Sequence, residues 1–166
     1  MAALGRLDDV SFLVLDDHAN MRKLWRTILG SMGARDVFEA QGGAEAFDFL
    51  RNSPVDVAIV DHVLPDLSGV EFISLLRTAD DSPVRHLPIV ACTAHTRRSV
   101  IKELVDAGAD EVLAKPVSVT AASEKINRVL SRRRSFVDAP RYYGPDRRRR
   151  RDDAFDPSAC RRGKTG

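Results

Sequence analysis

Five polar side chains in this sequence are of types that could transfer a phosphoryl group. They are three carboxylates, a hydroxyl and an amine: Asp16, Asp17, Asp61, Thr93 and Lys115. Converging carboxylates would bind a hard divalent cation, and Mg²⁺ fits best because it takes few carboxylates and keeps water and phosphate oxygens as its other ligands. Lys115 and Thr93 would contact phosphate oxygens. With the metal held by its neighbours, Asp61 could attack phosphorus and form an aspartyl phosphate.

Each of these side chains follows an apolar run where a strand would end. Strands are expected at residues 10–15, 36–40, 57–60, 88–92 and 111–114. Helices are expected at residues 20–32, 43–52, 69–78, 97–107 and 118–131. The alternation predicts a doubly wound (βα)₅ fold of the α/β class, with helices covering a parallel sheet. Because the carboxyl ends of parallel strands meet at one edge of such a sheet, we expect the five side chains to converge there.

The joint pattern resembles the receiver domain of two-component response regulators of the CheY type, which has a flavodoxin-like fold. The resemblance rests on Asp16-Asp17, on Asp61 with Pro65 and Gly69 downstream, on Thr93-Ala94 and on Lys115-Pro116. It implies phosphorylation of Asp61 by a phosphohistidine donor, such as a histidine kinase. It also implies phosphate contacts from Thr93 and Lys115, a cis peptide bond before Pro116, and Mg²⁺ on Asp16, Asp17, Asp61 and the Val63 carbonyl. Such a regulator is not expected to be an enzyme.

One position departs from the receiver pattern. Receivers usually carry Tyr or Phe three residues before the lysine that follows the fifth strand, and this chain has Val112 there. Phosphotransfer is therefore expected without the rotating aromatic side chain that reports it in the family. His95, two residues after Thr93, is expected to be a solvated loop residue near the site.

Composition divides the chain into an acidic body and a basic extension. Residues 132–166 hold eleven arginines and one lysine against five aspartates, a formal charge of +7, whereas residues 1–131 hold 14 basic and 19 acidic residues, a charge of −5. We therefore expect a receiver domain over residues 1–131 and a separate tail over residues 132–166. Two cysteines suggest no disulfide framework, and no stretch approaches a membrane span or a signal peptide, so the cytoplasm is the expected location.

The tail has too few aliphatic residues to build a core, so we expect it to be disordered until a ligand orders it. Its basic runs are interrupted by Tyr142, Tyr143 and Asp146. Guanidinium groups read the guanine edge and grip phosphate, tyrosines stack on bases, and a carboxylate accepts from guanine N–H groups. A ligand with two guanines and two phosphates would satisfy this set, and cyclic di-GMP is one such ligand.

The tail also resembles that of the Cle proteins, CheY-like regulators of alphaproteobacteria that bind cyclic di-GMP through an arginine-rich stretch containing Gly-Pro-Asp-Arg-Arg. The resemblance implies a ligand segment made of Arg141, Tyr143, Gly144, Pro145, Asp146, Arg147, Arg148, Arg149 and Arg151. It implies the flagellar motor switch as partner, control of motility or surface attachment, and recruitment to the flagellated pole.

Two other functions stay open at this stage. One is a conventional single-domain phosphoreceiver that serves a histidine kinase and carries an inert basic tail. The other is a tail that binds nucleic acid or anionic surfaces nonspecifically, although no specific nucleic acid is expected. Polyanion binding would weaken steeply with salt, whereas stacked guanine recognition would weaken less.

Overall fold

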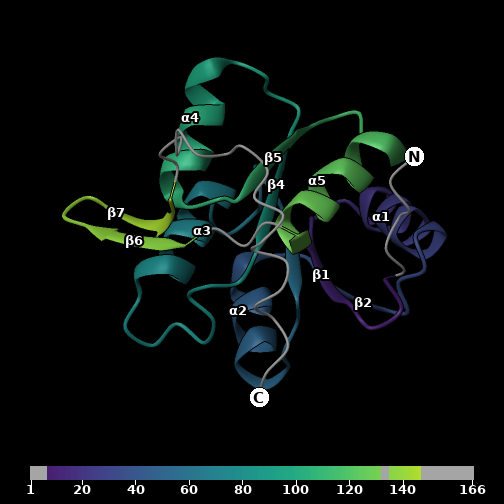
Figure 1. The fold of residues 1–166 in the computed structure, drawn as a ribbon, viewed down its shortest axis with the longest axis horizontal. Coiled ribbons are helices and arrows are strands. Elements are labelled where there is room, and N and C mark those ends of the chain that lie inside the picture. Colours follow the sequence, from purple (N-terminus) through teal and green to yellow (C-terminus); the bar gives the residue numbers. More distant parts are fainter. Residues whose placement is uncertain (1–6, 132–134, 147–166) are drawn as a thin grey trace, which may run out of the picture.

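The computed structural model describes residues 7–131 and 135–146. Its central element is a parallel five-stranded sheet in the order β2-β1-β3-β4-β5 (Figure 1). The strands are β1 (Ser11–Leu15), β2 (Asp36–Ala40), β3 (Val57–Asp61), β4 (Ile89–Thr93) and β5 (Glu111–Ala114). The helices are α1 (Ala19–Ser31), α2 (Gly43–Asn52), α3 (Gly69–Thr78), α4 (Arg98–Ala107) and α5 (Val119–Ser131). The predicted (βα)₅ fold is confirmed, with nearly every boundary within one residue of its expected place.

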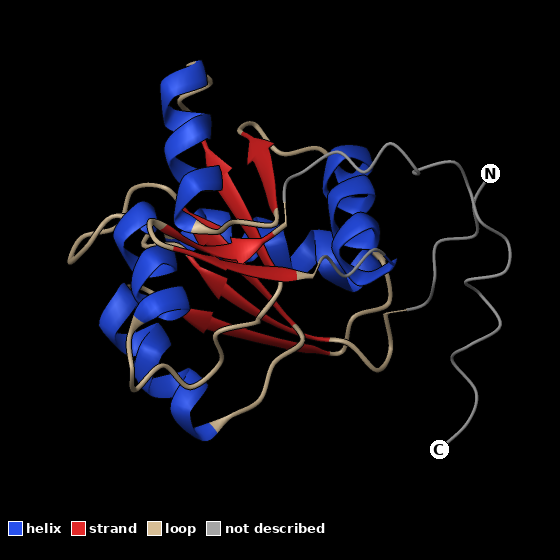
Figure 2. Cartoon of the chain, turned by 60° about the vertical axis from the view of Figure 1, so that its left-hand side comes forward, coloured by secondary structure: helices blue, strands red, loops and turns tan. Residues whose placement is uncertain are grey.

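Helices cover both faces of the sheet (Figure 2). Side chains of α2, α3 and α4 form one core with alternate strand residues such as Ala58 and Val60. Side chains of α1 and α5 form the second core with the strand residues that point to the other face of the sheet, such as Val57 and Ile59. All five residues of β3 are buried. Because a strand covered on both faces needs apolar side chains, its first four residues are apolar, and only the last, Asp61, is polar.

The extension contains a β-hairpin that the sequence analysis did not predict. Strands β6 (Phe136–Ala139) and β7 (Tyr142–Pro145) pair antiparallel, and the hairpin lies against α3 and α4 (Figure 1). The expectation that the whole of residues 132–166 is disordered without ligand is therefore wrong for residues 135–146. An isolated two-stranded hairpin is marginal in water, so the receiver body must supply the apolar surface that holds it.

Two contacts show how the hairpin is held. The Tyr142 hydroxyl donates a hydrogen bond to the Pro145 carbonyl at 2.8 Å. A Cβ added at Gly144 would lie 3.1 Å from the Cα of Gly108, so β7 approaches the end of α4 backbone to backbone. The predicted ligand residues Arg147, Arg148, Arg149 and Arg151 lie outside the described residues. Within the described residues no helix is long and apolar enough to cross a membrane.

Candidate functional sites

The carboxyl ends of the strands bring the predicted site residues together. Asp61 ends β3 opposite Cys92, and Thr93 ends β4 opposite Ala114, so the two polar residues leave adjacent strands at the same edge. The Lys115 ammonium lies 2.8 Å from a carboxylate oxygen of Asp61 and 3.2 Å from one of Asp16. The Lys115–Pro116 peptide bond is cis, as expected. The predicted convergence of Asp16, Asp61 and Lys115 is thus confirmed.

The chain after β3 holds Asp61 in place by close backbone packing. A Cβ at Gly69 would lie 2.3 Å from the Asp61 carbonyl oxygen, and the Gly69 N–H donates to the His62 carbonyl at 2.8 Å. Helix α3 begins there, with Ser68 and Glu71 forming a reciprocal capping box. Only glycine fits this approach, so Gly69 lets α3 begin in backbone contact with the end of β3.

Burial and charge act in opposite directions on the central ion pair. Asp61 is only 5% exposed, and this burial raises its pKa, with a smaller rise from Asp16, although Lys115 opposes both. Burial alone would lower the pKa of Lys115, but hydrogen bonds and attraction from Asp61 and Asp16 raise it overall. Lys115 therefore stays an ammonium and keeps two buried carboxylates compensated.

The residues at this edge fit a divalent cation. Ligand atoms of Asp16, Asp17, His18 and Asp61 lie within 4.8 Å of one another. The carboxyl groups of Asp16, Asp17 and Asp61 gather around the single ammonium of Lys115, so a further positive charge would lower the electrostatic cost of bringing them together. Oxygen-rich sites of this kind suit Mg²⁺. Val63 follows in the loop with its side chain 56% exposed, and the role of its carbonyl stays a prediction.

Thr93 is positioned by two histidines. Its hydroxyl lies 3.2 Å from Nδ1 of His62 and accepts the His95 backbone N–H at 2.9 Å. The two imidazole rings meet edge to face, with centroids 5.7 Å apart. His95 is exposed, as expected, but its backbone holds the threonine that should contact phosphate. Val112, at the position of the missing aromatic, is half-buried and packs against the core beneath α2, α3 and α4.

The family profile described as response regulator receiver domain matches residues 12–127. This chain belongs to the response regulator receiver domain family. Receiver domains bind Mg²⁺ at an acidic site, which here is the cluster of Asp16, Asp17 and Asp61. The match ends before the hairpin, so the extension is an addition to the receiver fold.

Similar proteins agree with this assignment. The receiver is 27% identical over 124 residues to the chemotaxis protein CheY-3 of Vibrio cholerae, covering 75% of this chain and 94% of that protein. It is 28% identical over 123 residues to the chemotaxis protein CheY of Pseudomonas aeruginosa, covering 74% of this chain and 98% of that one. Among solved structures, Vibrio cholerae CheY4 matches with a TM-score of 0.66 and 28% identity, covering 72% of this chain and 98% of that chain.

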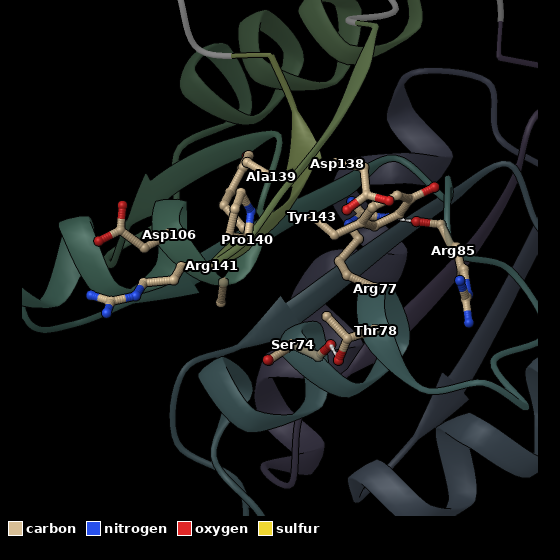
Figure 3. Close-up of a pocket in the computed structure, with 12 residues that line it drawn as sticks. Ser74, Arg77, Thr78, Arg85, Asp106, Asp138, Ala139, Pro140, Arg141 and Tyr143 are labelled. Carbon is tan, nitrogen blue, oxygen red and sulfur yellow. Dashed lines mark hydrogen bonds between the residues drawn. The ribbon is translucent and has the colours of Figure 1, made fainter.

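The described part of the predicted ligand segment is built into the hairpin. Gly144 and Pro145 are buried, and the Asp146 N–H donates to the Ser135 carbonyl at 2.7 Å, closing the hairpin. Arg141 and Tyr143 instead line a cavity of about 380 Å³ between the hairpin, α3 and α4 (Figure 3). Tyr143 also packs on His86 and Phe136, so it both docks the hairpin and lines the cavity.

Several neighbours of these sites were missed from sequence. His18 and His62 directly follow the aspartates that were chosen, and adjacency was the only signal for them. The receiver side of the cavity was missed entirely, and its polar residues come from three separate segments: Ser74, Thr78, Arg85 and Asp106. No motif marks them, because only the docking of the hairpin makes them one surface.

Proposed function

We propose that this chain is a CheY-like response regulator, not an enzyme, whose Asp61 accepts a phosphoryl group from a histidine kinase. A carboxylate oxygen of Asp61 attacks the phosphorus of a phosphohistidine, the new P–O bond forms as the P–N bond breaks, and the imidazole takes up a proton. Lys115 would move its ammonium onto the phosphoryl oxygens, and the Thr93 hydroxyl would donate to another. Bound Mg²⁺ would supply charge neutralisation at the transferred group.

The output of the regulator, we propose, is controlled by cyclic di-GMP bound at the extension. The observation that carries this proposal is the hairpin, because it places Arg141 and Tyr143 at the wall of a cavity. A basic tail that bound polyanions by charge alone would not need such a folded arrangement. The sequence continues from Asp146 directly into five arginines, 147–151. Guanidinium groups, a tyrosine ring and carboxylates together form the set that guanine and phosphate need.

The proposed partner is the flagellar motor switch. Support comes from the resemblance to the Cle proteins and from the similar proteins, whose names describe them as chemotaxis proteins. The protein would then act in the cytoplasm and gather at the flagellated pole when cyclic di-GMP is high. A fluorescent fusion that stays diffuse at every cyclic di-GMP level would contradict the recruitment.

Calorimetric titration of cyclic di-GMP into the full chain tests the nucleotide proposal. We expect saturable binding, and we expect the double substitution Arg147→Ala with Arg148→Ala to weaken it at least tenfold, because each charged hydrogen bond contributes about 1.5–3 kcal/mol. The substitution Asp146→Ala should also weaken cyclic di-GMP binding. A tail that binds polyanions by charge alone would bind more tightly after Asp146→Ala and would lose affinity steeply with salt.

A conventional phosphoreceiver is the second candidate function, and the complete Asp61, Thr93 and Lys115 constellation favours it. If the protein were only a phosphoreceiver, the extension would bind no ligand. Absence of any heat with cyclic di-GMP, together with phosphorylation of Asp61, would leave this function alone. The two functions are compatible, because their residues lie at separate places in the fold.

A further inference from the structure

The Thr93 hydroxyl belongs to a residue that is buried at the strand-end edge of the sheet. Thr93 is only 1% exposed, and it ends β4 directly beside β3, which ends at Asp61. A hydroxyl has one proton to donate and two lone pairs that accept. Because water hardly reaches Thr93, the protein groups around the hydroxyl oxygen decide where its single proton points.

Three contacts surround this oxygen. The His95 backbone N–H donates to it at 2.9 Å, and the His95 carbonyl oxygen lies 3.3 Å away as an acceptor. The third contact is Nδ1 of His62, at 3.2 Å. An imidazole nitrogen donates when it carries the ring proton and accepts when it does not. The orientation of the hydroxyl therefore depends on the tautomer of His62.

The His62 ring is held in place by its own backbone and by His95. The His62 N–H donates to the Cys92 carbonyl at 2.8 Å, which continues the pairing of β3 with β4 by one residue. The ring meets that of His95 edge to face, with centroids 5.7 Å apart. Strand pairing and ring packing together keep Nδ1 beside the Thr93 oxygen.

One tautomer of His62 satisfies all three contacts at once. With the proton on Nδ1, both lone pairs of the Thr93 oxygen are occupied, one by His62 and one by the His95 N–H. The hydroxyl proton is then left for the His95 carbonyl. With a lone pair on Nδ1 instead, the one hydroxyl proton would have to serve two acceptors. The geometry therefore favours the tautomer in which Nδ1 donates to Thr93.

The bond from the Thr93 hydroxyl to the His95 carbonyl is the weakest of the three contacts. Its length of 3.3 Å exceeds the ordinary range of about 2.5–3.0 Å for O–H···O bonds. A phosphoryl oxygen carries negative charge, and a charge-assisted hydrogen bond is about twice as strong as a neutral one. The hydroxyl proton can therefore turn from the carbonyl to a phosphoryl group, while the two N–H donors keep the oxygen in place.

We propose that His62 is a positioning residue for phosphoryl transfer to Asp61, because its Nδ1–H donates to Thr93 and leaves the hydroxyl proton for the phosphoryl group. The inference deepens the proposed function and rests on it. In this role His62 acts only through Thr93. Since the hydroxyl is oriented before the phosphoryl group arrives, less reorganisation is needed during the transfer.

Two substitutions of nearly equal size separate this role from a purely structural one. Asn carries an N–H donor at the side-chain position of the histidine Nδ1, whereas Leu carries none. With acetyl phosphate and Mg²⁺, a P–O bond to Asp61 forms as the P–O bond to acetate breaks, and the intact mass of the full chain follows the reaction. His62→Leu should slow phosphorylation about three- to tenfold, the equivalent of one neutral hydrogen bond. His62→Asn should stay within about twofold of the wild type.

The Thr93→Ala background tests whether His62 acts through the threonine. The hydroxyl is absent there, so adding His62→Leu should change the rate less than about twofold. An equal loss of rate with and without Thr93, or an unchanged rate in His62→Leu alone, would overturn the inference and leave the proposed function standing. Absence of phosphorylation in the wild type would overturn the proposed function, and this inference with it.

The tautomer of His62 can be measured without any phosphorylation. A nitrogen-15 nuclear magnetic resonance spectrum of the full chain resolves the ring nitrogens, and comparison with His62→Asn assigns those of His62. At about pH 8, where an ordinary imidazole is neutral, the spectrum should place the ring proton on Nδ1. A proton on Nε2 would make Nδ1 the acceptor of the Thr93 proton and would overturn the inference.

Discussion

The guanidinium carbon of Arg77 lies 4.9 Å from the centroid of the Phe136 ring. This contact joins a fully buried cation of the receiver to an aromatic residue of the extension, and its geometry is that of a cation–π interaction. His86 and Tyr143 complete the cluster, with ring centroids 4.5 Å and 5.8 Å from that of Phe136. The hairpin is thereby docked on the receiver as one folded unit.

Phe136→Ala should release the hairpin. A cation–π contact and aromatic packing together contribute about 1–2 kcal/mol at a partly buried site, so the hairpin should open about ten times more often. Amide hydrogen exchange at Asp146, whose N–H donates to Ser135, measures this opening. Phe38→Ala on β2 is the control, because that exposed ring packs on Phe49 far from the hairpin in sequence. Unchanged exchange at Asp146 would show that other contacts dock the hairpin.

Asp61→Asn should abolish phosphorylation and leave nucleotide binding nearly intact. The substitution removes the nucleophilic oxygen, whereas the hairpin cavity lies at the opposite edge of the sheet. Incubation with a small phosphoryl donor and Mg²⁺, followed by mass measurement of the intact chain, reports phosphorylation. Asp56→Asn, which affects a carboxylate bonded to Ser11, should still be phosphorylated. A large loss of cyclic di-GMP affinity in Asp61→Asn would contradict the separation of the two sites.

Asp66→Ala should destabilise the fold through α2. The Asp66 carboxylate accepts the N–H groups of Gly43 and Ala44 at 2.9 Å each, so its loss should lower the free energy of unfolding by about 1 kcal/mol. Asp48→Ala, which changes an exposed residue within α2 itself, should lower the free energy of unfolding less. Chemical denaturation at neutral pH measures both.

The effect of Asp66 should depend on pH. Backbone donation from Ala44 and Gly43 lowers the pKa of Asp66 below its ordinary 3.8. A carboxylate with a depressed folded-state pKa stabilises the fold above the unfolded value and loses this effect as the pH falls through the folded value. The difference between wild type and Asp66→Ala should therefore be constant above about pH 5 and shrink below about pH 4. A difference that grew in acid would contradict the capping role.

Cys92 should be chemically inert in the native protein. It lies in β4 with 1% exposure, and burial raises the pKa of its thiol far above neutral pH. In a Cys160→Ser variant, where Cys92 is the one cysteine left, a thiol reagent at pH 8 should react only after urea unfolds the chain. Rapid reaction of the folded variant would show that β4 opens readily.

Particular residues explain why most of the fold could be predicted. Apolar runs ending at Asp16, Asp61 and Thr93 marked the strands, and Gly33 and Gly108, with φ of +94° and +116°, mark helix ends that favour glycine. The strand-end position of each site residue followed from the parallel sheet alone. For the receiver, the elements expected from local sequence patterns are therefore those that the parallel sheet requires.

The hairpin could not be predicted in the same way. Its strands have four residues each and are stabilised by Arg77, His86 and Gly108, which lie far away in sequence. The His62–Thr93 contact was missed for a similar reason, because it depends on side-chain geometry between two strands. Tertiary contacts, not local composition, decide both features.

The most direct test of the account is a nuclear magnetic resonance titration of the isotopically labelled full chain with cyclic di-GMP. We predict that amide signals of the hairpin, and of Arg77, Arg85 and Gly108 behind it, shift with ligand. Signals of Asp61, Thr93 and Lys115 should stay in place. Shifts confined to the Asp61 edge, or no shifts at all, would contradict the claim that this receiver carries a nucleotide site on its hairpin.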